Sequence, residues 1–279
     1  MPVRLTTPGS GHRPTPLVAR AGEVRALLAP GLDPALAASW LADPAALAPD
    51  ATGPRWHGPS ADGRWFVKRR RGRSGRRALE RSLRVGLHLE AHGLRAGRAL
   101  AVLRRPAPGG GEHTWLVSGL LAGEDLDRAL AAADEAGRAE LSRRVGRLVA
   151  ALHAAGVRQR DLKAPNVLVD VGTPTLVDLE GMAVRHGGLG RRLRAKDLGR
   201  LAASYLALGL AGGPAEEPER GAPPPAGSAL GLLGAAYLER LAELAPAERV
   251  DDPDAWLGLV LGHGRAKVAR NARRGRVLR

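Results

Sequence analysis

The chain contains no cysteine in its 279 residues. This absence excludes disulfides, thiolate nucleophiles and zinc sites with cysteine ligands, and it fits a reducing compartment. Arginine, aspartate or proline interrupts every stretch rich in alanine and leucine, so the sequence excludes a membrane-spanning helix. The segment Met1–Arg4 leads into Thr, Pro and Gly instead of the apolar run of a signal peptide, and we expect a cytoplasmic protein.

Lysine and aromatic residues are also scarce. Only five tryptophans, two tyrosines and one phenylalanine are present, and we find no nucleic-acid-binding motif, so we expect no nucleic-acid partner. The net charge of +15 indicates an anionic partner such as phosphate or a membrane surface. Because an ammonium and a guanidinium are not interchangeable at a tight phosphate site, the few lysines are candidates for function. They are Lys68, Lys163, Lys196 and Lys267.

The amino-terminal part of the chain divides into two segments by composition. Residues 1–50 are rich in proline, alanine and glycine and are predicted to be a loosely structured lead-in, with short helices opening at Asp33 and Asp43. Residues 51–118 are predicted to form a small mixed lobe. Its expected elements are strands at 64–68, 99–103 and 114–117, a basic loop at 69–77, and an amphipathic helix through Leu79, Leu83 and Leu87 that ends near Gly93.

Residues 119–279 are predicted to form a mainly helical lobe with a basic carboxyl end. A hinge at Gly119–Gly123 precedes it. A helix that ends at Gly156 is followed by two short apolar runs that predict a hairpin, and a surface loop and two helices complete the lobe. These elements are expected at 167–169 and 175–177 for the hairpin, 211–228 for the loop, and about 229–245 and 253–272 for the helices.

Two polar motifs lie on either side of the predicted hairpin, QRDLKAPN at 159–166 and VDLEG at 177–181. Together they resemble the catalytic core of protein-kinase-like enzymes. The resemblance implies that Asp161 accepts the substrate hydroxyl proton, and that Lys163 neutralises the transferring phosphoryl group. It also implies that Asn166 and Asp178 bind Mg²⁺, and a hairpin would bring these two residues together. The alternative is an unrelated fold in which Asp161 caps a turn and Asp178 ends a strand.

The same resemblance implies an α+β, protein-kinase-like two-lobed fold with a small mixed β/α N-lobe and a mainly helical C-lobe. In such a fold Lys68 reaches the nucleotide phosphates and pairs with a helix glutamate, which we expect to be Glu80, with Glu90 as the alternative. The nucleotide would lie under the hinge at Gly119, Leu120 and Leu121. Lys68 could otherwise be the first member of a solvated basic run.

Further segments narrow the resemblance to one family. The string LHAAGV at 152–157, the DLEG at 178–181, the KDLGRL at 196–201 and the arginine-rich carboxyl end are together similar to the lipopolysaccharide kinase family of Kdo and heptose kinases. The similarity covers about residues 55–279. It implies ATP and Mg²⁺ as cofactors, and transfer of the γ-phosphoryl group to a sugar hydroxyl of a glycolipid at the cytoplasmic face of the inner membrane.

Several positions depart from the kinase pattern. Gln159 replaces the usual His, Glu180 replaces a Gly with Gly181 one place later, no Ala-Pro-Glu segment follows, and only Gly58 and Gly63 could cover a phosphate. The missing Ala-Pro-Glu segment argues against the second hypothesis, a protein serine/threonine kinase. A third hypothesis is a catalytically dead, kinase-like scaffold that binds a membrane or a partner.

Four other features have competing interpretations. His88 and His92 have the spacing of helical metal ligands but lack a third ligand, and His153 is expected to be structural. Asp197 either braces the segment 159–166, which we call the catalytic loop, or is surface charge. The segments 64–77 and 265–279 hold eight and seven basic residues and no acidic ones, which suits docking on anionic lipid or glycolipid.

Overall fold

The computed structural model describes residues 4–6, 15–211 and 222–274. The chain forms two compact units, Met1–Leu121 and Ala122–Arg279, which divide within the segment 119–123. As predicted, the first unit is built on a β-sheet and the second is mainly helical. None of the described helices has the length and apolar character that crossing a membrane requires.

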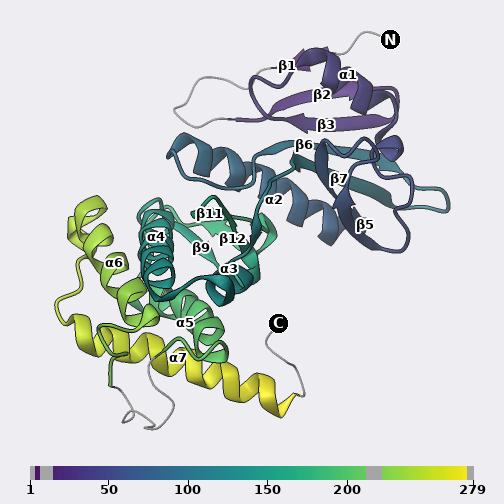
Figure 1. The fold of residues 1–279 in the computed structure, drawn as a ribbon. Coiled ribbons are helices and arrows are strands. Elements are labelled where there is room, and N and C mark those ends of the chain that lie inside the picture. Colours follow the sequence, from purple (N-terminus) through teal and green to yellow (C-terminus); the bar gives the residue numbers. More distant parts are fainter. Residues whose placement is uncertain (1–3, 7–14, 212–221, 275–279) are drawn as a thin grey trace. The chain divides into compact units, whose positions relative to one another are not determined.

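One antiparallel sheet organises the first unit (Figure 1). Its strands lie in the spatial order β1-β2-β3-β6-β7-β5-β4, so that the two strands flanking the longest helix in sequence, β5 and β6, are separated by β7. The strands are β1 (Arg4–Thr6), β2 (Leu17–Ala21), β3 (Val24–Leu28), β4 (Arg55–Pro59), β5 (Trp65–Arg71), β6 (Ala99–Pro106) and β7 (Glu112–Gly119).

The prediction of a loosely structured lead-in at residues 1–50 was wrong for the part that the structure describes. Strands β2 and β3 form a hairpin, and β3 pairs with β6 in the centre of the sheet. The helix α1 (Pro34–Ala42) follows, and Asp33 caps it by accepting the amide hydrogen of Ala35 at 2.8 Å. Composition gives little sign of these strands, because each is only five residues long. In β3 the buried Val24, Ala26 and Leu28 alternate with the exposed Arg25 and the half-buried Leu27.

Helix α2 (Gly72–Ala91) begins earlier than predicted, and no basic loop separates it from the preceding strand. Strand β5 continues through Arg71 because its backbone pairs with β7 as far as His113. Gly72 then turns the chain from strand to helix at φ +79°, a conformation that favours glycine. Backbone pairing explains why a run of arginines forms a strand here, since side-chain charge does not interrupt the ladder.

The two faces of this sheet carry different helices. The apolar core of one face contains Val67, Trp115 and Val117 together with Trp40 and Leu41 of α1. Helix α2 covers the opposite face, mainly over β6 and β7. Successive side chains of β6 mark the two sides, because Arg105 forms an ion pair with Asp43 at the end of α1 and Arg104 forms one with Glu80 of α2. Leu116 and Thr114 are two residues apart in β7, so their side chains lie on the same face of the sheet. Lys68 is paired with Leu116 and Arg104 with Thr114, so Lys68 lies on the α2 face with Arg104.

The second unit consists of helices around two small sheets. The predicted hairpin is confirmed, since β10 and β11 pair in antiparallel fashion, and the two predicted carboxyl-terminal helices are confirmed as α6 and α7. Most of the predicted loop at 211–228 lies outside the described residues. The elements are β8 (Glu124–Asp125), α3 (Leu126–Ala132), α4 (Glu135–Ala154), β9 (Val157–Gln159), the 3-10 helix η2 (Ala164–Asn166), β10 (Val167–Asp170), β11 (Thr173–Leu176), η3 (Leu179–Gly181), β12 (Met182–Val184), α5 (Arg191–Ala207), α6 (Ala229–Leu244), η4 (Pro246–Glu248) and α7 (Pro253–Arg273).

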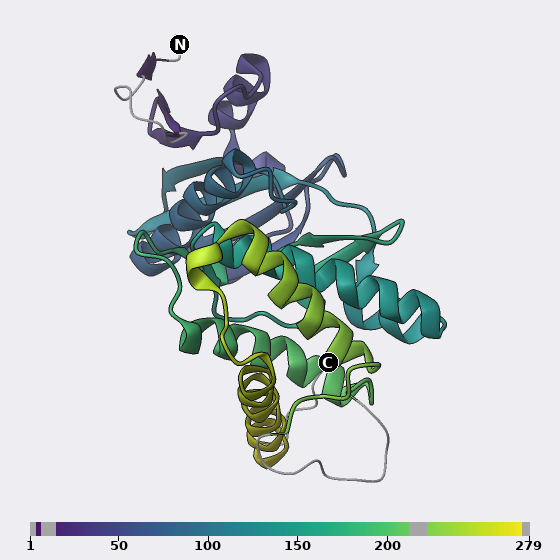
Figure 2. The ribbon, with the colours of Figure 1, turned by 90° about the vertical axis from the view of Figure 1, so that its left-hand side faces the viewer.

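Close helix packing fixes the position of α5, the helix that supports the polar motifs. Helix α7 packs along α5, and α6 packs along α4 (Figures 1 and 2). Both contacts depend on glycine, because a Cβ on Gly146 of α4 would collide with the backbone of α6, and a Cβ on Gly264 of α7 would lie 3.2 Å from the carbonyl oxygen of Gly199 in α5. The absence of side chains at these positions lets the helix backbones approach closely.

Candidate active site

The hairpin brings the two polar motifs of the second unit together. Val177 donates its amide hydrogen to the carbonyl oxygen of Asn166 at 3.0 Å, so the next residue, Asp178, lies beside Asn166. The side-chain amide of Asn166 donates to the carbonyl oxygen of Asp161 at 2.6 Å. Lys163 places its Nζ 3.5 Å from Oδ2 of Asp161. These four predicted residues therefore form one cluster.

The cluster presents a carboxylate and an ammonium group to solvent. The side chains of Asp161 and Lys163 are 52 % and 45 % exposed. Asn166, by contrast, is 7 % exposed and is fixed by its hydrogen bond to the catalytic loop. An accessible carboxylate beside an accessible ammonium can accept a hydroxyl proton and stabilise an anionic group at the same place.

The donor set of Asn166 and Asp178 fits Mg²⁺. Because the amide nitrogen of Asn166 is used in a hydrogen bond, its Oδ1 is the atom left to act as a ligand. Asp178 occupies a left-handed conformation at φ 55°, which a non-glycine residue adopts only where its surroundings hold it. Amide and carboxylate oxygens are hard ligands, and Mg²⁺ commonly uses one or two of them together with substrate phosphates and water.

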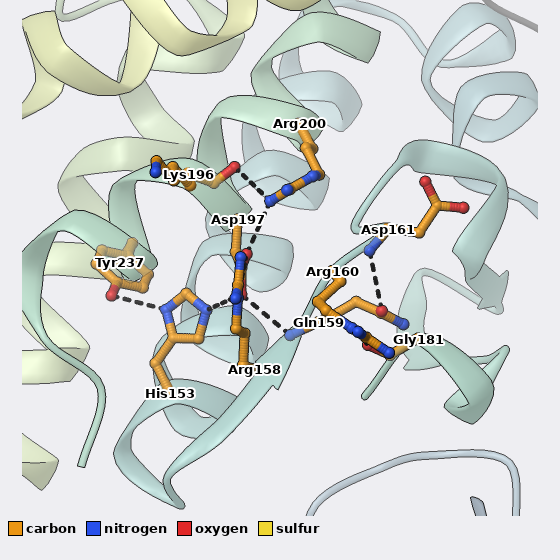
Figure 3. A network of polar contacts seen from close by, with 10 residues as sticks. All are labelled: His153, Arg158, Gln159, Arg160, Asp161, Gly181, Lys196, Asp197, Arg200 and Tyr237. Carbon is orange, nitrogen blue, oxygen red and sulfur yellow. Dashed lines mark hydrogen bonds and ion pairs between the residues drawn. The ribbon is translucent and has the colours of Figure 1, made fainter. Parts of the chain in front are cut away.

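Gln159 links the two motifs through the oxygen and the nitrogen of its side-chain amide, and Figure 3 shows its contact with Asp161. Its Oε1 accepts the amide hydrogen of Asp161 at 3.1 Å, and its Nε2 donates to the carbonyl oxygen of Asp178 at 3.1 Å. The side chain lies against Gly181, where any Cβ would collide with Oε1 of Gln159. The two departures from the kinase pattern are therefore complementary, since the glycine at 181 makes room for the glutamine at 159.

Asp197 braces the catalytic loop from helix α5, and the alternative of a surface charge was wrong. Its side chain is fully buried, and its Oδ2 accepts the amide hydrogen of Gln159 at 3.0 Å. Its Oδ1 lies 2.9 Å from Nη1 of Arg200 and 3.3 Å from Nε of Arg158 (Figure 3). Burial raises the pKa of Asp197 to about 6, although both guanidinium groups favour the carboxylate and oppose this rise.

His153 has the structural role predicted for it. It is fully buried, its Nδ1 lies 2.9 Å from the hydroxyl of Tyr237, and its Nε2 lies 3.9 Å from Asp197. Burial and the nearby Arg194 lower the pKa of His153 to about 3, so the ring is neutral near pH 7. A neutral ring that accepts from Tyr237 carries its proton on Nε2, toward Asp197.

Comparison with known proteins agrees with this geometry. A family model described as "Lipopolysaccharide kinase (Kdo/WaaP) family" matches residues 70–217, which is more than half of the chain and includes both polar motifs. The chain belongs to this family. The Kdo/WaaP family consists of kinases, so the chain is a member of a phosphotransferase family.

The fold of this Kdo/WaaP family member is also found among solved structures. The structure titled "WaaP in complex with acyl carrier protein" is 23 % identical, with a TM-score of 0.52, and the match covers 79 % of this chain and 86 % of that chain. This likeness confirms the protein-kinase-like fold. No curated protein matches the chain.

We expected Lys68 to pair with Glu80 or Glu90 of α2, but the ion pairs that these two glutamates form among the described residues are with arginines. Glu80 lies 3.4 Å from Arg104 and 3.8 Å from Arg76, and Glu90 lies 3.3 Å from Arg98. The reason is the strand order, because α2 directs Glu80 toward β6, which is two strands and about 10 Å from β5. Lys68 nevertheless lies on the α2 face of the sheet, and its contact with nucleotide phosphates stays a prediction.

The remaining predicted residues take simple places in the first unit. Gly119 ends β7 opposite Trp65, and Leu120 and Leu121 follow it. Leu120 is 46 % exposed. Their contact with a nucleotide stays a prediction. The rings of His88 and His92 are tilted by 40° with their centroids 4.2 Å apart, and the described residues hold no group of three His, Cys, Asp or Glu side chains that could bind a metal.

Sequence reasoning missed three residues that hold the site. Arg158 and Arg200 neutralise Asp197, and Ser204 of α5 accepts the amide hydrogen of Ala164 at 3.1 Å. A usable signal was present, since Arg200 follows Asp197 by three positions on one helix, where side chains face each other. Together with Asp197, they attach the catalytic loop to α5.

Proposed function

We propose that this chain transfers the γ-phosphoryl group of ATP to a sugar hydroxyl of a glycolipid that resembles the lipopolysaccharide core. Its membership of the lipopolysaccharide kinase family supports this proposal. The observation that carries it is the cluster in which Asp161, Lys163, Asn166 and Asp178 are connected by hydrogen bonds and an ion pair.

The proposed chemistry depends on positioning and charge. Asp161 orients the acceptor hydroxyl and takes its proton, and Lys163 stabilises the negative charge of the phosphoryl group in transit. Asn166 and Asp178 would hold Mg²⁺, which when bound neutralises the phosphates of ATP. Gln159 keeps Asp161 and Asp178 at a fixed separation through its two hydrogen bonds.

The binding of ATP is proposed to use the first unit as well. Lys68 would contact the nucleotide phosphates, and the chain at Gly119–Leu121 would contact the base. We also propose that the protein is cytoplasmic and works at the inner face of the membrane. The exposed members of its basic segments, such as Arg64, Arg73 and Arg77, would then approach anionic headgroups.

The test is transfer of label from γ-labelled ATP with Mg²⁺ into a glycolipid fraction and, in parallel, into protein. Asp161→Asn should reduce glycolipid labelling by about 100-fold or more, because it removes the proton acceptor. Asp170→Asn is the matched control, since this exposed aspartate ends strand β10 and should leave labelling unchanged.

Each outcome distinguishes one hypothesis. Labelling of glycolipid that depends on Asp161 supports the sugar kinase. Labelling that appears only in protein would favour a protein kinase. Folded protein that transfers no label to any acceptor would favour the scaffold and would refute the proposal.

A further inference from the structure

Three arginines oppose one another across neighbouring strands of the first unit. Arg20 of β2 is paired in register with Arg25 of β3, which is paired in register with Arg104 of β6. Directly opposed residues of antiparallel strands project from the same face, so all three side chains lie on the α2 face with Arg104. Like charges in such positions repel each other, and the arrangement therefore favours an anion placed between them.

A hollow of about 360 Å³ opens over these arginines. We use the name arginine pocket for this hollow and four arginines that line it, because the side chain of a fifth lining residue, Arg105, pairs with Asp43 on the opposite face of the sheet. A second hollow of about 310 Å³ adjoins it, because the two share Arg20, Arg25 and Arg104. The hollows arise because α2 packs mainly over β6 and β7 and leaves the outer strands less covered. The arginines of the pocket are Arg20, Arg25, Arg76 and Arg104.

Carboxylates on the rim hold part of this lining in place. Arg104 lies 3.4 Å from Glu80, and Arg76 lies 3.0 Å from Glu112. These two arginine side chains are only 23 % and 27 % exposed. Four arginines place their charge in the pocket, and three glutamates, Glu23 and Glu112 of the lining and Glu80 beside Arg104, oppose them, so a positive charge remains after the ion pairs are formed. No described residue forms an ion pair with Arg25, although other lining residues have partners.

We infer that the arginine pocket binds a phosphate group, carried either by a small phosphorylated molecule or by a lipid headgroup. Guanidinium groups bind phosphate through paired hydrogen bonds, and several of them around one hollow provide both charge and geometry. The volume suits a small ligand larger than phosphate alone. Strands β2 and β3 lie outside residues 70–217, so Arg20 and Arg25 come from outside the segment that the family model matches.

The first test measures binding of glucose 6-phosphate, with glucose as the matched ligand without phosphate. Calorimetry and thermal unfolding should detect glucose 6-phosphate, and Arg25→Gln should weaken its binding about tenfold or more, because a charged hydrogen bond is lost. Arg98→Gln is the control in the same unit. Arg98 pairs with Glu90, ten helical residues and about 15 Å along α2 from Glu80.

The second arm identifies the source of the phosphate. Flotation compares vesicles of equal parts phosphatidylglycerol and phosphatidylcholine with vesicles of phosphatidylcholine alone. Loss of binding in Arg25→Gln supports the inference in either arm, and the arm that shows it identifies a soluble ester or a headgroup. Asp178→Asn separates this site from the proposed transfer site, because ligand bound at the arginine pocket should not depend on Asp178.

A charge reversal keeps the inference falsifiable if a variant loses binding through misfolding. Arg25→Glu replaces repulsion with Arg20 and Arg104 by attraction, so the ligand-free protein should unfold at a higher temperature while phosphate binding is abolished. The inference is overturned if neither probe binds. It is also overturned if binding survives in Arg25→Glu, or if Arg98→Gln or Asp178→Asn weakens binding as much as Arg25→Gln does.

Discussion

The buried carboxyl of Asp197 should make the stability of the second unit depend on pH in a way that a single substitution removes. Its side chain has no solvent exposure and contacts Arg158, Arg200 and the amide of Gln159. Asp197→Asn keeps the size and an acceptor oxygen but cannot ionise. The difference in stability between the wild type and this variant therefore isolates the ionisation of one group.

The magnitude follows from the rise of the pKa of Asp197 from 3.8 to about 6 in the folded protein. Because the folded state binds the proton more tightly, this group favours folding fully below pH 3.8, and the contribution is lost as the pH rises through about 6. The loss amounts to about 3 kcal/mol. The wild type should therefore lose about 3 kcal/mol of stability relative to Asp197→Asn between acid and neutral pH. His153 is present in both proteins, so its own contribution cancels in the difference.

Native-state hydrogen exchange of β9 and α5 measures this difference, because it reports the opening of the second unit alone. The free energies of opening for the two proteins should diverge as the pH is raised from about 4 to about 7. A difference that stays constant over this range would refute the raised pKa of Asp197. A difference of the opposite sign would mean that the two arginines outweigh burial.

Three other perturbations test separate parts of the structure. Gly181→Ala should lower the turnover of phosphoryl transfer about 10-fold or more, because the added Cβ displaces the side chain of Gln159. The far-UV circular dichroism should change little, and unchanged turnover would contradict the role of this glutamine. Turnover of the wild type should fall as the pH is lowered through about 6, where Asp197 becomes protonated, and a pH-rate profile without this fall would contradict the brace. Trp40→Ala should destabilise the first unit by about 3 to 5 kcal/mol in urea unfolding, since Trp40 is 4 % exposed in its core, whereas a loosely structured lead-in would give almost no change.

Local chemistry made several elements of both units predictable from sequence. The helix starts after Asp33 and Asp252 follow from an acceptor side chain before proline, and both aspartates accept the expected amide hydrogens. The two short apolar runs at 167–169 and 175–177 likewise predicted a hairpin, because a turn between two short strands is decided by neighbouring residues. Signals of this kind act within a few residues and can be read directly.

Partners set by strand order could not be predicted in the same way. Lys68 and Glu80 are close in sequence, but β7 lies between β5, which carries Lys68, and β6, which Glu80 faces. Glu80 therefore forms an ion pair with Arg104 of β6 instead. The opposition of Arg25 to Arg104 depends equally on a register between residues nearly 80 positions apart in the sequence. Long-range pairing of this kind is fixed by the whole sheet, and no local pattern specifies it.

The departures at 159 and 181 have a different meaning once the contacts are known. Considered singly, the loss of the usual histidine and the displaced glycine suggest a disabled site. In the structure the glutamine amide serves the amide hydrogen of Asp161 and the carbonyl of Asp178 at once, and it fits only because residue 181 has no side chain. Asp197 then fixes the backbone of that glutamine to α5. Because the glycine leaves room for the glutamine and the glutamine joins Asp161 to Asp178, the pair supports a working alternative to the histidine arrangement and argues against a site that has decayed.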